Sequence, residues 1–542
     1  MGAEVSTPIV ERMIIYNYKK YQKFDIAFND DITILVGANE CGKSTIIEAL
    51  NLCLKLQINN RSIASEISPF LFNNKVVKEY FAAIKSGREN VKPPFILIEV
   101  YFKNSECCAK YKGTNNSMKE NKSGIKVSIE LDSAFREEYG EYIKNGIESI
   151  PTEYYTIVRT SFAGNLIKYN ELPLKPFTIA NMENRFQNGV DRFITDILDD
   201  AMDDQNRAKM SVNYRALKNR FIESEDIKRV NEAIRAEKIS DKEVTISLDI
   251  STKSSFDSSL TLYVDDIPLK YCGKGEQTAI KSRLALNSKA DMMNLIMIEE
   301  PESNQSFANM RELIASMIEA CVGKQVIITT HSSYVINKYG LDKIIMIGTN
   351  SDGAPYSLKL SDLDDDVYKY FKKLPGYDTL RAILSKKIIL VEGPSDELIV
   401  QKAYSVNHNG KLPLDEGVDV FTVNSLAFKR FLELLKNIGG IVHVVTDNDG
   451  DPYSNRIQEL RKYETDKIHI YCCPDGTLKT LEPCFVRVND LIMLNKIFNK
   501  SCKSEEELVK YMVDHKTEWA LQIFDSDDDM KFPEYIVDAV KD

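Results

Sequence analysis

Two pairs of carboxylates follow apolar segments in the second half of the chain. Glu392 ends one apolar run, with Asp396 about one helical turn later, and Asp447 and Asp449 follow the apolar run 441–445. Acids that end neighbouring parallel strands meet at one edge of a sheet, and the D-x-D spacing puts Asp447 and Asp449 on one side of an extended segment. Crowded carboxylates repel unless hard cations such as Mg²⁺ or Mn²⁺ neutralise them, and such ions activate water against phosphodiesters. The pattern predicts metal-dependent cleavage of a phosphodiester bond.

A phosphate-binding loop lies in the first half. The apolar run 32–36 leads into GANECGKS, residues 37–44, and a helical pattern follows. A P-loop requires a strand, then G-x-x-x-x-G-K-[ST], then a helix, and this segment has all three in that order. A glycine turn that arose by chance would not be expected to have both neighbours. Lys43 is expected to reach the outer phosphates and Ser44 to ligate Mg²⁺. The residues expected to bind nucleotide here are Gly37, Asn39, Gly42, Lys43, Ser44 and Thr45.

Three further motifs follow in the order of an ATPase. The apolar run 293–298 delivers Glu299 and Glu300, a Walker B arrangement in which Glu299 holds Mg²⁺ and Glu300 polarises water. His331 ends the next apolar strand, where it can contact a γ-phosphate. A glycine-rich turn, 273–277, opens a helix expected over 278–286, and a helix N-terminus attracts anions.

These motifs resemble an ABC-type ATPase of the RecF/SMC/Rad50 kind. The resemblance implies that two ATPase heads sandwich ATP, with Lys274 and Gly275 of one head's signature turn facing the P-loop of the other. The chain departs from the pattern at Lys274, where a serine is usual, and at Glu299, where an aspartate is usual. ATP binding is therefore a firmer expectation than fast hydrolysis.

The second half resembles a Toprim domain, through V-E-G-x-x-D at 391–396 and D-x-D at 447–449. An ABC ATPase followed by Toprim resembles the OLD (overcoming lysogenization defect) nuclease family, which includes the Gabija nuclease and OLD-type effectors of some retrons. The resemblance implies two metal ions held by Glu392, Asp396, Asp447, Asp449 and Glu482. It also implies that Lys516 stabilises charge on the scissile phosphate. The alternative for Glu482 and Lys516 is ordinary surface charge.

An α/β fold must position these residues, and 542 residues suggest about three domains. The expected parts are an ABC ATPase head in two pieces, 1–182 and 241–375, a helical insertion at 183–240, a Rossmann-like Toprim domain at 376–495 and a helical extension at 496–542 that completes the nuclease site. Phe193, Ile197 and Ala201 recur at helical spacing in the insertion, which is either a layer on the same domain or a dimerisation arm. Strands are expected within 243–265 and a linker over 349–370.

Composition and charge argue against membrane-spanning, secreted and generally basic proteins. No apolar run is long enough to cross a bilayer, and the N-terminus lacks the features of a secretory signal. Ten cysteines without a C-x-x-C pair predict reduced thiols and a cytoplasmic location. The net charge of −11 argues against a generally basic protein and leaves local DNA binding open.

Together these features predict an ATP-regulated DNA endonuclease that nicks or cuts both strands, acts in antiphage defence, and uses two Mg²⁺ or Mn²⁺ ions in the Toprim site and one with ATP. The alternative is an ATP-dependent DNA-binding recombination or repair protein of the RecF/SMC type with an inactive Toprim domain. The resemblance implies DNA, a homodimer or higher oligomer, and a UvrD-like helicase or a retron reverse transcriptase with its small DNA as partners. A topoisomerase would need a tyrosine nucleophile in further domains, and a primase a zinc module.

Overall fold

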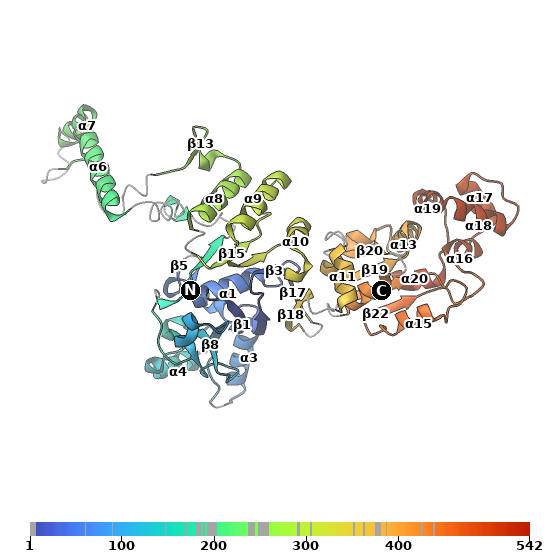
Figure 1. Ribbon diagram of the computed structural model, residues 1–542, viewed down its shortest axis with the longest axis horizontal. Coiled ribbons are helices and arrows are strands. Elements are labelled where there is room, and N and C mark those ends of the chain that lie inside the picture. The colour runs from blue at the N-terminus through green and yellow to red at the C-terminus, as the bar shows by residue number, and fades with distance from the viewer. Residues whose placement is uncertain are drawn as a thin grey trace, which may run out of the picture. The chain divides into compact units, whose positions relative to one another are not determined.

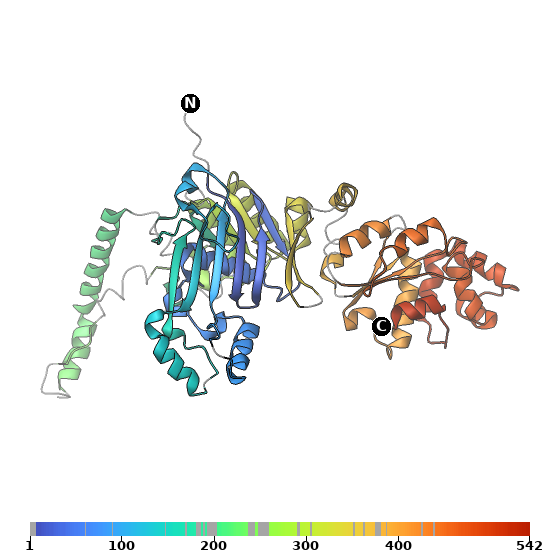
Figure 2. The ribbon, with the colours of Figure 1, turned by 90° about the horizontal axis from the view of Figure 1, so that it is seen from below.

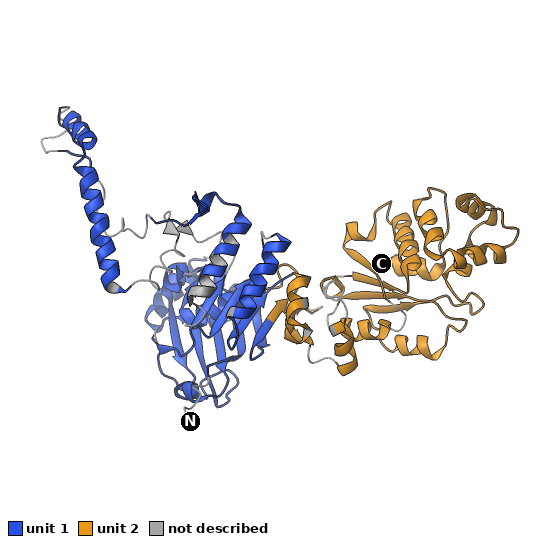
Figure 3. Ribbon diagram, turned by 45° about the horizontal axis from the view of Figure 1, so that its top comes forward, with its two compact units in different colours: residues 1–33, 44–331 blue, residues 34–43, 332–542 orange. Residues whose placement is uncertain are grey.

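The computed structural model describes most of the chain in ranges separated by gaps. The described residues are 7–59, 61–88, 90–146, 148–168, 171–179, 186–187, 190–191, 203–236, 244–247, 260–289, 293–303, 306–350, 353–360, 364–373, 381–385, 387–423, 427–436 and 440–541. The chain divides into two compact units, residues 1–33 with 44–331 and residues 34–43 with 332–542 (Figure 3). Among the described residues, no helix has the length and apolar character needed to cross a bilayer. All ten cysteines are described, and all are free thiols.

The first sheet is antiparallel and belongs to the ATPase half. Its strand order is β2-β1-β6-β8-β7, with β9 pairing β8 (Figure 2). Both faces of β1 are covered at its centre, because Met13, Ile14 and Ile15 are all buried, and Ile15 lies opposite both Phe24 and Ile98. The strands are β1 (Val10–Tyr18), β2 (Tyr21–Ala27), β6 (Ile96–Phe102), β7 (Lys112–Gly113), β8 (Lys122–Leu131) and β9 (Tyr155–Ser161).

The second sheet carries the ATPase motifs at its strand ends. Its order is β10-β15-β16-β3-β17-β18, and β15 runs parallel to β16 with Glu299 opposite Thr329. Apolar runs without alternation, buried along their length, are what a parallel strand covered on both faces requires. The strands are β3 (Ile32–Val36), β10 (Pro176–Ile179), β15 (Leu295–Glu299), β16 (Gln325–Thr329), β17 (Ile344–Thr349) and β18 (Pro355–Lys359).

Helices accompany these two sheets in the N-terminal two thirds of the chain (Figure 1). The described part of the insertion contains α6 and α7, and α7 carries Ile227, Val230 and Ile234 at helical spacing. Phe193, Ile197 and Ala201 lie outside the described residues. The helices are α1 (Lys43–Lys55), α2 (Ile63–Glu66), α3 (Asn74–Lys85), α4 (Arg136–Lys144), α6 (Asp204–Ile222), α7 (Glu225–Ala236), α8 (Lys274–Lys289), α9 (Phe307–Ala320) and α10 (Ser333–Tyr339). Helix α11 (Asp365–Lys373) packs instead on the C-terminal part of the chain, where the rings of Phe371 and Phe431 lie 5.0 Å apart between centroids.

The helix expected over 278–286 is confirmed, but it begins at Lys274, so the signature turn forms its first turn. Two other local predictions are wrong. Residues 244–247 are not a strand, and the described part of 243–265 holds only one of the two short strands of a hairpin, β13 (Tyr263–Val264), whose partner is β14 (Ile267–Pro268). The expected linker at 349–370 contains β18, which pairs with β17, and the start of α11, because an acidic first turn suits a helix N-terminus.

The third sheet lies in the C-terminal half and is wholly parallel. Its order is β20-β19-β21-β22, with β19 between β20 and β21. The strands are β19 (Lys387–Val391), β20 (Val418–Thr422), β21 (Ile441–Val445) and β22 (Ile468–Tyr471). The helices are α13 (Pro394–Asn407), α14 (Phe428–Leu435), α15 (Asn455–Arg461), α16 (Leu481–Val488), α17 (Leu491–Phe498), α18 (Glu505–Asp514), α19 (Lys516–Asp525) and α20 (Glu534–Val540).

The C-terminal helices share one hydrophobic core with this sheet. Ile389 and Val391 of β19 belong to the same buried cluster as Phe485 of α16 and Trp519 of α19. The rings of Phe485 and Trp519 lie 5.6 Å apart between centroids. Residues after 495 are therefore packed into the fold that carries the acids.

Candidate functional site

The acids of the second half meet at the carboxyl ends of β19 and β21. Val391 and Val445 are opposite one another in the parallel register, so Glu392 and Thr446 each follow at the same edge. The carboxyl edge of a parallel sheet is where sites form in α/β folds, because the loops diverge there. The predicted convergence of the two strand ends is confirmed.

Asp396 lies in the first turn of α13, directly after the β19 edge. Its carboxylate accepts a hydrogen bond from the backbone N–H of Gly393, at 3.1 Å. Burial, and then the charges of Glu392 and Glu482, raise the pKa of Asp396 to about 7. Those two acids therefore lie close enough to Asp396 to disfavour its charge.

The pKa of Asp447 is raised further than that of Asp396. Burial, followed by the charges of Asp396, Glu392, Glu482 and Asp449, raises the pKa of Asp447 to about 8. The other four predicted acids thus all act electrostatically on Asp447. A cation among them would remove this repulsion, and hard divalent ions prefer carboxylate oxygens. The donor set fits Mg²⁺ or Mn²⁺ in its chemistry.

The remaining acids differ in exposure. Glu482, on the first turn of α16, is 9% exposed and accepts a hydrogen bond from Thr480 at 2.7 Å. Asp449 adopts a left-handed backbone conformation, with φ of 51°, and its side chain is 64% exposed. Within the described ranges, no three His, Cys, Asp or Glu side chains are arranged as they stand to hold a metal ion.

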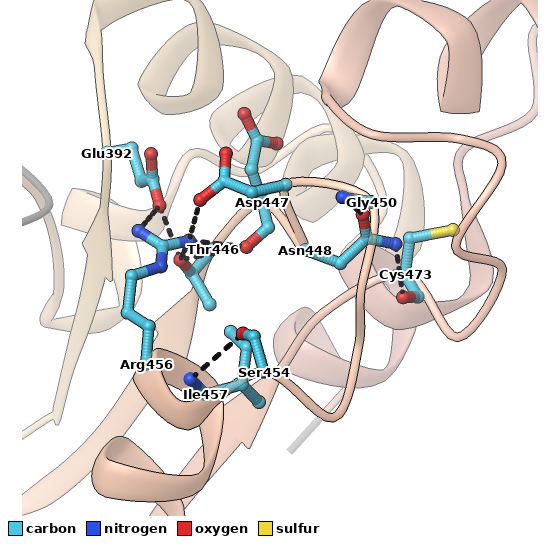
Figure 4. A network of polar contacts seen from close by, with 10 residues as sticks. Glu392, Thr446, Asp447, Asn448, Gly450, Ser454, Arg456, Ile457 and Cys473 are labelled. Carbon is cyan, nitrogen blue, oxygen red and sulfur yellow. Dashed lines mark hydrogen bonds and ion pairs between the residues drawn. The ribbon is translucent and has the colours of Figure 1, made fainter.

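Arg456, on α15, lies among these acids and was not predicted. Its Nη1 donates to Glu392 Oε1 at 2.9 Å, and its Nη2 lies 3.2 Å from Asp449 Oδ2 (Figure 4). Nη2 also donates to the Asp447 carbonyl at 2.6 Å and to Thr446 Oγ1 at 3.0 Å. Thr446 in turn donates to Glu392. An arginine inside a helix pattern gives no signal in the sequence, so only the fold reveals this contact.

Two acids near the site have other partners. Glu397 accepts hydrogen bonds from Thr422 at 2.6 Å and from Gln401 at 3.2 Å. Asp451 accepts from the backbone N–H of Tyr453 at 2.9 Å, which stabilises the turn after β21. Both roles are structural.

Two lysines deserve comparison as candidate phosphate contacts. Lys516 is exposed and is the first residue of α19. Lys479 was not predicted, but its side chain runs beside Gly450, and a Cβ built at Gly450 would lie 3.3 Å from Lys479 Cε. The Lys479 carbonyl also accepts a hydrogen bond from the Asp449 N–H at 3.2 Å. Lys479 is thus the lysine that contacts the D-x-D loop.

Two glycines of the predicted P-loop occupy positions that only glycine fits. Gly42 has φ of 107°, and a Cβ at Gly37 would lie 2.2 Å from the Ile347 carbonyl oxygen, so both glycines are required. Lys43 is only 5% exposed and its Nζ donates to the Gly37 carbonyl at 2.9 Å. Asn39, Ser44 and Thr45 flank it, with Ser44 exposed in the first turn of α1.

The residues after β15 and β16 form a second polar cluster. His331 Nε2 lies 3.9 Å from Glu300 Oε1, so these two predicted residues are brought together. Glu302, which was not predicted, accepts hydrogen bonds from Thr330 Oγ1 at 2.9 Å and from the His331 N–H. Glu302 therefore fixes the strand end that carries His331. Glu299 is the last residue of β15, and Lys274 and Gly275 open α8.

Comparison with known proteins gives two family matches. Residues 9–336 match the AAA ATPase domain family, and residues 383–449 match the family described as overcoming lysogenization defect protein-like, TOPRIM domain. A curated relative is Endonuclease GajA of Bacillus cereus (strain HuB5-5), which is 24% identical over 544 residues and covers 85% of this chain and 78% of its own.

Solved structures are more distant. The SMC head domain from Thermotoga maritima is 15% identical, with a TM-score of 0.29, over 65% of this chain and 98% of its own. The recombination mediator RecF with ATP is 11% identical, with a TM-score of 0.32, over 61% of this chain and 93% of its own. At these scores the structural likeness carries no argument.

Proposed function

We propose, on the premise that the chain belongs to the OLD (overcoming lysogenization defect) family of ATPase–Toprim proteins, that it is a divalent-metal-dependent DNA endonuclease regulated by ATP. The observation that carries the proposal is the set of mutually repelling acids at the carboxyl edge of the third sheet. Burial, and then the charges of the other acids, raise the pKa of both Asp396 and Asp447. A protein that needed only a stable fold would be more stable without these charges.

The proposed ligands are Glu392, Asp396, Asp447, Asp449 and Glu482. Two Mg²⁺ or Mn²⁺ ions bound there would lower the pKa of a water molecule and neutralise charge on the scissile phosphate. Glu392 and Asp447 are held at adjacent strand ends, while Asp449 is exposed and can turn toward a bound ion. Lys516 is the proposed partner of the phosphate charge.

The test is cleavage of supercoiled plasmid with Mg²⁺ or Mn²⁺. Wild type is expected to nick or linearise the plasmid, and Glu392→Ala to lose at least about two orders of magnitude in rate. Glu464→Ala, an exposed acid in the same unit, is the matched control and should behave as wild type. Equal rates for wild type and Glu392→Ala would refute the proposal.

We propose that ATP acts as a regulator. Lys43, Ser44 and Thr45 would bind the phosphates and Mg²⁺, with Glu299 holding the ion, and Glu300 and His331 would act at the γ-phosphate. The contact of His331 with Glu300 supports a shared role for these two. Cleavage rates without nucleotide, with ATP and with a non-hydrolysable analogue should differ, and identical rates in all three would exclude regulation by ATP.

Lys274 and Gly275, in the signature turn, support the further proposal of a homodimer or larger assembly, to be measured by solution mass. A role in antiphage defence, with a helicase or a retron reverse transcriptase and its DNA as partner, is proposed from family resemblance. The relative's name, Endonuclease GajA, favours the nuclease.

The rival function is that of an ATP-dependent DNA-binding protein with an inactive Toprim domain, and the pairing of Arg456 with Glu392 is the observation in its favour. Failure to bind Mn²⁺ at Asp447 and Asp449 would support the rival.

A further inference from the structure

A cation of the chain itself lies inside the proposed metal site. We propose that the guanidinium of Arg456 holds Glu392 and Asp449 until a divalent cation displaces it, so that Arg456 sets how tightly the site binds metal. The inference rests on the proposed function, because it concerns the same acids. Arg456 is a positioning residue in this proposal and takes no part in bond cleavage.

The contacts of Glu392 carry the first step of the argument. Its Oε1 accepts a hydrogen bond from Arg456 Nη1 at 2.9 Å and a second one from Thr446 Oγ1. A carboxylate oxygen has two lone-pair sites, so both sites of this atom are used. Oε1 becomes available to a metal ion when one of these two donors leaves, and the guanidinium is the donor whose positive charge repels the ion.

The second acid is held in the same way. Arg456 Nη2 lies 3.2 Å from Asp449 Oδ2, on the exposed side of the D-x-D loop. One guanidinium thus bridges the acids that follow two different strands, β19 and β21. These are acids that the proposed function assigns to the metal, and a guanidinium offers five donors and no lone pair, so it cannot itself be a ligand.

The helix that carries Arg456 is fixed, and the side chain is not enclosed. Ile457 is fully buried and Leu460 is 4% exposed, which anchors α15, and Ser454 Oγ caps the helix by accepting from the Ile457 N–H. The Arg456 side chain is 30% exposed. It can therefore rotate toward solvent without movement of the helix.

The positive charge of Arg456 determines whether its removal tightens or weakens binding of the metal ion. Displacing the positive charge of Arg456 costs its hydrogen bond to the Glu392 carboxylate and its ion pair with Asp449, a cost that corresponds to an affinity weakened by about tenfold. Removing that charge should therefore tighten binding of the metal. If Arg456 instead stayed in place and oriented Glu392 for the metal, removing it would weaken binding.

The experiment measures Mn²⁺ binding to the full chain by electron paramagnetic resonance, at pH 7.5 without nucleotide or DNA. Arg456→Gln is expected to bind Mn²⁺ about tenfold more tightly than wild type. Arg461→Gln, which removes the same charge from the exposed end of α15, is the matched control and should change affinity by less than about twofold. An Asp447→Asn, Asp449→Asn double variant defines binding elsewhere in the protein.

A second variant guards against misfolding. Arg456→Lys keeps the charge but loses the forked contact with Glu392 and Asp449, so its affinity should lie between wild type and Arg456→Gln. Unchanged or weaker Mn²⁺ binding in both Arg456 variants would overturn the inference. If wild type bound no more Mn²⁺ than the double variant, the metal site itself, and with it the proposed function, would fail. The two failures are therefore distinguishable.

Discussion

Replacing Asp447 by asparagine should stabilise the metal-free protein while removing its response to metal. The folded state raises the pKa of Asp447 from 3.8 to about 8, because the carboxylate is buried beside Asp396, Glu392 and Glu482. A carboxyl group with a raised pKa binds its proton more tightly when folded, so it costs stability as pH rises from about 4 to about 8. Asparagine has nearly the same shape and no charge, and it escapes that cost.

The magnitude follows from the two pKa values. At 1.36 kcal/mol per pH unit, the difference corresponds to roughly 5 kcal/mol at pH 8 and roughly 2 kcal/mol at pH 5.5. Part of it remains in the variant, because the amide is also polar and half-buried and water screens the remaining acids. We therefore expect a gain of about 2–3 kcal/mol at pH 8, which is about 5–10 °C in Tm for a unit of this size, and less than half of that at pH 5.5.

The assay is thermal unfolding in EDTA at pH 5.5 and pH 8, for wild type, Asp447→Asn and the control Asp466→Asn, an exposed aspartate of the same unit. Addition of Mg²⁺ at pH 8 should raise the Tm of wild type and leave that of Asp447→Asn almost unchanged. A variant that is less stable than wild type at pH 8, or a difference that does not change with pH, would refute the electrostatic reasoning. The same behaviour in Asp466→Asn would show that surface charge, and not the site, is responsible.

Three further predictions concern other parts of the chain. Gly37→Ala should abolish nucleotide binding in a fluorescent-ATP assay, because its Cβ would lie 2.2 Å from the Ile347 carbonyl oxygen. The matched control is Gly140→Ala, at a glycine of α4 with open space around it, and this variant should bind as wild type does. Lys43→Ala should weaken ATP binding at least about tenfold and remove the effect of ATP on cleavage, and an unchanged ATP response would contradict the regulatory role. Lys516→Ala should lower the cleavage rate about a hundredfold with Mn²⁺ affinity unchanged, and Lys479→Ala much less; the reverse order would assign the phosphate contact to Lys479.

The acids were predictable because the signal is local. An apolar run that ends in Glu392, and another that ends before Asp447, each mark a buried strand with a carboxylate at its end. The parallel sheet then brings the two ends together without further information, and the family prediction made from these motifs is confirmed. The same reasoning found the P-loop after β3 and Glu300 after β15.

Contacts that depend on packing were not predictable. Arg456 lies in an ordinary helix pattern, and its contact with Glu392 depends on where the fold places α15 relative to the end of β19. Glu302 is one acid among three in a turn, and only the register of β15 with β16 brings it to Thr330. The hairpin partner β18 has few apolar residues, since it is half-exposed along its length, so periodicity gives no signal for it.

The acidic edge has two ways of being neutralised, and they exclude one another at Glu392 Oε1. With Arg456 in place, one positive charge serves Glu392 and Asp449, while Asp396 and Asp447 have no cation within ion-pair distance in the described residues. Burial and then the neighbouring charges raise the pKa of both Asp396 and Asp447, so protons are the remaining means of neutralising these two acids. A divalent ion supplies two charges and can contact several acids at once, so it replaces both the arginine and the protons. Metal binding should therefore release protons near neutral pH, and the amount released should fall in Asp447→Asn.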